Sequence, residues 1–115
     1  MKIKLLALML FLSSLAFATN EESYNINNEA DCIILADENS IICKFITQPS
    51  NEDQEVKLLW IGPKNIIQRE RDITISAKNS SIYDYRFLDG RDKGTWTFKV
   101  LKGEEELAST TFEVE

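Results

Sequence analysis

The chain has 115 residues, with 13 lysines and arginines against 19 aspartates and glutamates and no histidine, which gives a formal net charge of −6 at pH 7. This length allows one hydrophobic core but not two. The excess of carboxylates repels nucleic-acid phosphates and anionic lipids, so we expect neither as a partner. A basic partner or a divalent cation remains compatible with this charge.

Residues 1–18, MKIKLLALMLFLSSLAFA, predict a cleaved secretory signal peptide. Lys2 and Lys4 precede an unbroken apolar run, and Ala16 and Ala18 form an A-x-A cleavage site. A membrane anchor is the alternative, but the apolar segment is shorter than the roughly 20 residues that a spanning helix needs. The short, lysine-led segment is typical of bacteria, so we expect the protein in the periplasm or outside the cell.

Cleavage would leave residues 19–115 with a net charge of −8, because the removed segment carries two lysines and no acid. Residues 19–29 are polar and rich in asparagine, and we expect them to form a flexible lead-in. Residues 30–115 predict a single domain without membrane insertion. Nothing in the sequence indicates an oligomeric state.

Residues 30–115 predict strands rather than helices. Short runs rich in isoleucine, valine, threonine and aromatic residues alternate with clusters of asparagine, aspartate, glycine and proline, and no helical periodicity is evident. About seven short strands favour an all-β fold of two antiparallel sheets, a β-sandwich. The expected strands are 32–36, 41–47, 55–61, 72–76, 82–87, 95–101 and 107–114.

The two cysteines, Cys32 and Cys43, lie on the first two expected strands. A hairpin with its loop at 36–39 would place them directly opposite each other, within the distance of a disulfide. In an exported protein such a bond persists, and closing this short loop predicts a stabilisation of about 3 kcal/mol. A redox pair or a zinc site is the alternative, but the chain has no C-x-x-C motif and no histidine.

The third expected strand is apolar on both faces, because Val56, Leu58 and Trp60 alternate with Leu59 and Ile61. This pattern favours a central strand covered on both sides. The alternative is that its second face meets a partner.

The last two expected strands specify their own register. Trp96, Phe98 and Val100 share one face, and pairing Trp96 with Phe112 and Val100 with Ala108 buries the large apolar groups together. A slip by one residue would expose the aromatic side chains to water.

Two charged segments are candidate sites. Asp84, Asp89 and Asp92 precede an expected strand in a loop with two glycines, which makes them weak candidates for calcium ligands. Their spacing does not match an EF-hand, and two basic side chains in the loop would oppose the cation, so a plain turn is favoured. The segment 68–72, Gln-Arg-Glu-Arg-Asp, predicts an exposed turn or edge with local ion pairs.

Nothing in the sequence predicts catalysis. The absence of histidine removes the commonest general base, and a disulfide would remove thiol chemistry. No pair of carboxylates stands out as the acid and base of a glycoside hydrolase. We therefore predict no catalytic residue, no cofactor and no enzymatic activity.

Three apolar blocks resemble the strands of a known group of domains. They are 56–60 (VKLLW), 94–100 (GTWTFKV), and Leu107 with 112–114 (FEV). They are similar to motifs of small exported bacterial domains with an immunoglobulin-like sandwich, many of them uncharacterised, and the chain also resembles small acidic periplasmic proteins. The resemblance implies an immunoglobulin-like fold and no catalytic residue.

Tyr83 and Tyr85 are the aromatic residues that the expected core accounts for least. On an exposed strand they would anchor a partner through aromatic contacts or strand addition. The sequence therefore predicts a non-catalytic protein–protein interaction module that binds another envelope or secreted protein. The alternative is a small-ligand or calcium-binding periplasmic protein that uses the loop between Asp84 and Asp92.

Overall fold

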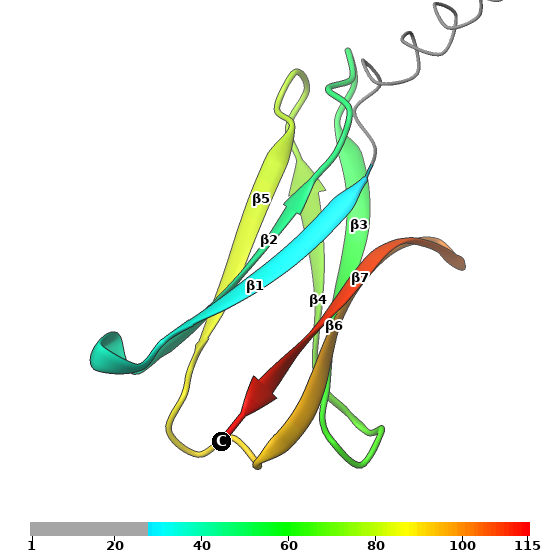
Figure 1. The fold of residues 1–115 in the computed structure, drawn as a ribbon. Coiled ribbons are helices and arrows are strands. Elements are labelled where there is room, and N and C mark those ends of the chain that lie inside the picture. The colour runs from blue at the N-terminus through cyan, green and yellow to red at the C-terminus, as the bar shows by residue number, and fades with distance from the viewer. Residues whose placement is uncertain (1–27) are drawn as a thin grey trace, which may run out of the picture.

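The computed structural model describes residues 28–115, which form seven strands in two antiparallel sheets (Figure 1). One sheet has the order β1-β2-β5 and the other the order β4-β3-β6-β7. The strand pattern of the sequence predicts this all-β, two-sheet fold. Along the chain the elements are β1 (Glu29–Leu35), the 3-10 turn η3 (Ala36–Glu38), β2 (Ser40–Ile46), β3 (Gln54–Ile61), β4 (Ile67–Ile75), β5 (Ser81–Phe87), β6 (Gly94–Lys102) and β7 (Glu105–Val114).

The predicted signal peptide, and the lead-in as far as residue 27, lie outside the described residues. The end of the lead-in belongs to the sandwich. Glu29 pairs with Ile46 at the start of β1, and Thr47 Oγ1 donates a hydrogen bond of 2.6 Å to Asn28 Oδ1. Within residues 28–115, no helix is long and apolar enough to cross a membrane.

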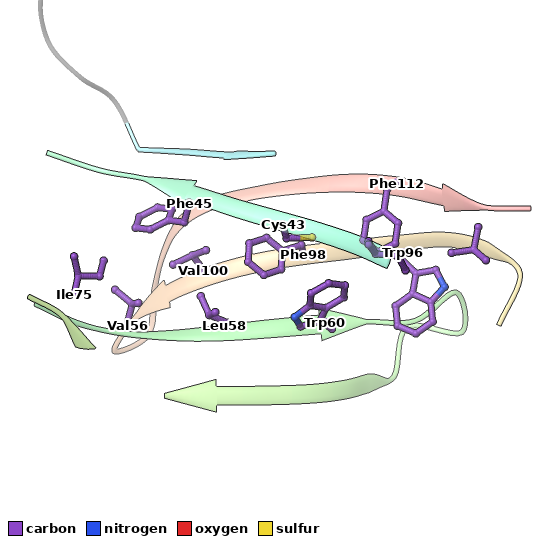
Figure 2. Close-up of a cluster of buried hydrophobic side chains, with 12 residues drawn as sticks. Cys43, Phe45, Val56, Leu58, Trp60, Ile75, Trp96, Phe98, Val100 and Phe112 are labelled. Carbon is purple, nitrogen blue, oxygen red and sulfur yellow. The ribbon is translucent and has the colours of Figure 1, made fainter. Parts of the chain in front are cut away.

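Alternate side chains of the two sheets fill the space between them (Figure 2). Trp60 of β3 is fully buried there, and its ring lies edge to face with Phe98 at 5.5 Å and with Phe112 at 5.9 Å between centroids. Edge-to-face contact is favourable because the positive rim of one ring meets the negative face of the other. The other buried apolar residues are Ile41, Cys43, Phe45, Val56, Leu58, Leu59, Ile75, Trp96, Val100 and Val114.

The β1–β2 hairpin has the predicted register and disulfide. Cys32 lies opposite Cys43, with their Cα atoms 4.1 Å apart, and the two sulfur atoms are bonded. The turn η3 forms most of the loop, and Asn39 ends it with a left-handed φ of 55°. Asparagine adopts this conformation more readily than most residues do, because its short side chain can bond to the backbone.

The central strand and the last hairpin also follow the sequence pattern. β3 lies between β4 and β6, as predicted, and Leu59 on its second face is only 7% exposed. β6 and β7 pair Trp96 with Phe112 and Val100 with Ala108, and the register shifts by a bulge directly after Val100. The predicted faces are therefore the observed ones.

β4 differs from the expectation, because it begins at Ile67 rather than at residue 72. Residues 68–72 form an edge strand and not a turn. Charged residues on both faces hide the alternation that usually marks a strand. The ion pairs are not local either. On the outer face Lys57 of β3 donates to Glu70 Oε2 at 2.8 Å and lies 3.1 Å from Asp72 Oδ1, while the arginines point to the opposite sheet.

Candidate functional site

Asp84 of β5 is a buried carboxylate that receives hydrogen bonds from the opposite sheet. Its side chain is 2% exposed. Trp60 Nε1 donates to Oδ2 at 2.9 Å, Arg71 Nη1 to Oδ1 at 2.7 Å, and Arg69 Nε to Oδ2 at 3.3 Å. The amide of Tyr85 donates to Oδ1 at 3.1 Å. The carboxylate therefore ties β5 to β3 and β4 of the other sheet.

The environment of Asp84 favours its ionised form. Burial alone would raise the pKa of Asp84 from its ordinary value of 3.8. The hydrogen bonds from Trp60, Arg69 and Arg71 outweigh burial, so the pKa lies below that value. The side chain is therefore charged at neutral pH, and a cation bound here would have to displace guanidinium groups.

All the arginines of the chain lie in the region of β4, β5 and the loop that follows β5. Arg69 and Arg71 come from β4, Arg86 lies on the same face of β5 as Asp84, and Arg91 comes from the loop between β5 and β6. Lysines supply every other basic side chain. We call Arg69, Arg71, Arg86 and Arg91 the arginine cluster. Four positive charges thus lie in one region of a protein that is acidic as a whole, and two of them bond to the buried carboxylate.

An open groove of about 330 Å³ runs along the cluster. Arg69, Arg86 and Arg91 line it together with Tyr85 and Phe87, and we call this space the arginine groove. Aromatic walls and guanidinium groups therefore meet in one concave site. Such a mixture of apolar surface and a few polar groups is typical of ligand sites.

Two guanidinium groups in the arginine groove are incompletely bonded. Nη1 of Arg86 and Nε of Arg91 are buried and have no hydrogen-bond partner within residues 28–115. Burial, followed by the positive charges of Arg91 and Arg69, lowers the pKa of Arg86 from its ordinary value. The Arg86 Cζ atom also lies 5.9 Å from the centre of the Trp60 ring, which offers partial compensation by a cation–π contact.

The outer face of the sheet β1-β2-β5 exposes large apolar side chains. The exposed fraction is 51% for Ile33, 62% for Tyr83, 58% for Tyr85 and 60% for Phe87. Ile33, Ile42 and Tyr85 form one row across the three strands, because they are paired in register. We call these five residues the aromatic face.

The aromatic face and the arginine cluster are adjacent around the free edge of β5. An open groove of about 640 Å³ joins them, and its lining includes Ile42, Tyr83 and Tyr85 on one side and Arg69 and Arg71 on the other. A ligand at this edge would therefore meet both surfaces.

The sequence-predicted site residues separate in the structure. Tyr83 and Tyr85 lie on the surface, where a partner could contact them. The amide of Asp89 donates to Asn39 Oδ1 at 2.7 Å, and the carbonyl oxygen of Asp92 accepts a hydrogen bond from Trp96 Nε1 at 2.8 Å. Asp84, Asp89 and Asp92 therefore do not form a metal site together: among residues 28–115, no three histidine, cysteine, aspartate or glutamate side chains are placed to hold a metal ion.

The arginine cluster is the feature that sequence reasoning missed. One signal was available: every arginine lies between residues 69 and 91, whereas lysines are spread along the whole chain. Arginine differs from lysine in its planar group, which bonds carboxylates through two parallel contacts. The confinement of arginines to one segment indicates a site that needs the planar guanidinium group and not only a positive charge.

No family model matches the chain, and no curated protein matches its sequence. Among solved structures, a β-glucosidase from Kluyveromyces marxianus is similar over 80% of this chain, with a TM-score of 0.48 and 10% sequence identity. The chain corresponds to 15% of the length of that protein. So weak a likeness carries no information about function.

Proposed function

We propose that the protein is an exported, non-catalytic module that binds another envelope or secreted protein through the aromatic face. The observation that carries this proposal is the exposure of Ile33, Tyr83, Tyr85 and Phe87 by more than half on one sheet face. Aromatic side chains with few rotatable bonds are the commonest energetic anchors of protein interfaces. A contiguous apolar surface of this kind is a usual mark of an interaction site.

The charge around the aromatic face indicates the kind of partner. Arg69 and Arg71 border the face through the groove that they share with Tyr83 and Tyr85, and Lys44 lies 6.0 Å from the centre of the Tyr83 ring. These basic side chains favour a partner with carboxylates beside its apolar contact surface on the β5 side, whereas the exposed Asp31 borders the face on β1. We therefore expect a partner with an acidic contact surface.

Export to the periplasm rests on two features. Residues 1–18 have the pattern of a signal peptide, and Cys32 and Cys43 form a disulfide, which persists in oxidising compartments. The partner is accordingly sought among proteins outside the cytoplasm.

An immunoglobulin-like topology is the finer assignment of the fold that we propose. It is supported by the sheets β1-β2-β5 and β4-β3-β6-β7, whose connections β2–β3, β4–β5 and β5–β6 cross between the sheets. The fully buried Trp60 on the third strand also matches the tryptophan of such domains. The disulfide departs from the pattern, because it joins β1 to β2 within one sheet instead of bridging the two.

The proposal is tested by site-specific photo-crosslinking in producing cells. A crosslinking residue at Tyr83 is compared with one at Thr111, an exposed position on the outer face of β7. We expect a discrete product with a heavier acidic protein at Tyr83 only, and its loss when Phe87→Ser is added. A product equally strong at Thr111, a product of two copies of this chain, or no product would each overturn the proposal.

A small-ligand protein is the second candidate, and the structure alters the expected ligand. Arg69 and Arg71 already occupy the oxygens of Asp84, and their charges oppose a second cation. The cluster therefore favours an anion over calcium. Thermal unfolding with calcium added checks this point, and we expect no shift of the melting temperature.

A further inference from the structure

The arginine groove contains positive groups that the described part of the chain does not satisfy. Asp84 is shared by Arg69 and Arg71, and no carboxylate of residues 28–115 forms an ion pair with Arg86 or Arg91. Nη1 of Arg86 and Nε of Arg91 are buried donors with no partner within residues 28–115. A buried, unbonded donor costs free energy, and the cost is larger for a charged group. Two cationic side chains with unbonded donors therefore line the same groove.

We propose that the arginine groove is a binding site for a carboxylate group. A carboxylate has two oxygens that accept hydrogen bonds, and Arg86 and Arg91 line the groove with two guanidinium groups that could donate to them once the side chains turn their unbonded nitrogens toward it. Tyr85 and Phe87 form apolar walls on which the carbon stem of the ligand would pack. The ligand is thus an organic acid with a short apolar stem, either free or as an acidic side chain of a partner.

The neighbouring Asp84 is an example of a carboxylate bound by arginines in the same cluster. Its carboxylate accepts bonds from Arg69 and Arg71 at distances of 2.7 to 3.5 Å, within the same cluster of arginines. A second carboxylate in the arginine groove would repeat that arrangement with Arg86 and Arg91. It would also reduce the repulsion that Arg86 receives from Arg69 and Arg91, so binding is expected to stabilise the folded protein.

The site does not depend on the proposed interaction at the aromatic face. Its evidence is the unbonded guanidinium nitrogens, whereas the aromatic face was inferred from exposed apolar side chains. A structural role alone, in which the arginines only shield the edge of β5 from pairing, predicts no affinity for carboxylates. The two explanations therefore differ in a measurable way.

The experiment titrates the ¹⁵N-labelled mature chain with 4-methylpentanoate and, as the uncharged control, 4-methylpentanamide, at constant ionic strength. We expect saturable shifts of the arginine side-chain signals with the acid only. Arg91→Gln should weaken binding by about tenfold, because it removes one charge-assisted hydrogen bond. Lys93→Gln, which removes the same charge from an exposed position of the same loop, should change it less than about twofold.

Three results would overturn the proposal: equal binding of acid and amide, equal binding by Arg91→Gln and the parent protein, or no saturation at about 50 mM acid. A second arm compares the acid with the peptide acetyl-Leu-Glu-Leu-amide. Tighter binding of the peptide assigns the carboxylate to a partner protein, and tighter binding of the free acid assigns it to a small molecule. Carboxylate binding without crosslinks at Tyr83 would overturn the proposed function and leave this site standing.

Discussion

Two cross-links of different kinds meet in one row of the sheet β1-β2-β5. Cys43 has Cys32 opposite it on one side and Asp84 on the other. The disulfide joins β1 to β2 within the sheet, whereas Asp84 joins the sheet to Trp60 and Arg71 of the opposite one. One link is covalent and local, and the other is ionic and long-range.

The two links should stabilise the protein by different means. The disulfide closes a short loop and remains intact when the chain unfolds, so it mainly restricts the unfolded ensemble. The bonds of Asp84 exist only in the folded state, and they join residues 13 to 24 positions apart. Asp84 therefore also fixes how the sheets lie against each other at the β4–β5 edge.

Asp84→Ala is expected to have the largest effect on stability. It leaves Nε1 of Trp60 unbonded in the core and removes the counter-charge of Arg69 and Arg71. We expect the free energy of unfolding to fall by about 3–4 kcal/mol, within the range for a broken buried ion pair. This loss lies at the lower end of the range for buried ion pairs, because the arginine side chains keep access to water. Urea unfolding measures the change.

Asp72→Ala is the matched control for Asp84→Ala. Asp72 is also an ion-paired carboxylate, but its side chain is 82% exposed beside Lys57. We expect a loss below about 0.5 kcal/mol, as for most exposed ion pairs. Similar losses for the two variants would show that burial of Asp84 is not what makes its bonds important.

Loss of the disulfide is the next largest effect that we expect. The double variant Cys32→Ala and Cys43→Ala should lower the free energy of unfolding by about 3 kcal/mol, because the unfolded chain gains the freedom of the opened loop. Adding reductant to the parent protein should give a similar loss, and adding it to the double variant should change nothing. A stable double variant would mean that the β1–β2 hairpin holds its register by packing alone.

The sequence predicted the covalent link and not the ionic one, for a physical reason. The β1–β2 hairpin is local, and alternating apolar side chains determine its register and hence the meeting of Cys32 and Cys43. The same logic predicted β6 with β7 and the central place of β3. These elements are specified by neighbours in sequence or by one face of a strand.

Asp84 and its partners could not be deduced in this way. Trp60, Arg71 and Asp84 come from three strands, and only the stacking of the sheets brings them together. Sequence reasoning left Arg69 and Arg71 in an exposed turn or edge with local ion pairs, because a strand with charged residues on both faces lacks the usual pattern. Only the tertiary packing of the two sheets turns these arginine side chains inward and places Arg86 beside them.

The two links should also differ in their response to acid. The pKa of Asp84 lies below its ordinary value of 3.8, so the unfolded state takes up its proton at higher pH than the folded state does. The stability that Asp84 supplies is complete above that value, and it is lost as the pH falls through the lower pKa of the folded protein. The contribution of the disulfide should not change over this range.

Urea unfolding from pH 6 to pH 2 checks this prediction by comparing the parent protein with Asp84→Asn. Asparagine is close in size but cannot ionise, so the gap in stability between the two should narrow as the pH falls. A gap that is constant across the range would mean that the charge of Asp84 does not supply the stability.

The smallest expected effect distinguishes the two halves of the arginine cluster. Arg91→Gln should change the free energy of unfolding by less than about 0.5 kcal/mol, because Nε of Arg91 has no partner within residues 28–115. Arg71→Gln should cost clearly more, since it removes the bond of 2.7 Å to Asp84. A large fall in the free energy of unfolding for Arg91→Gln would mean that Arg91 stabilises the folded protein. The expected order instead means that Arg69 and Arg71 stabilise the sandwich, while Arg86 and Arg91 remain available for a carboxylate from outside the described domain.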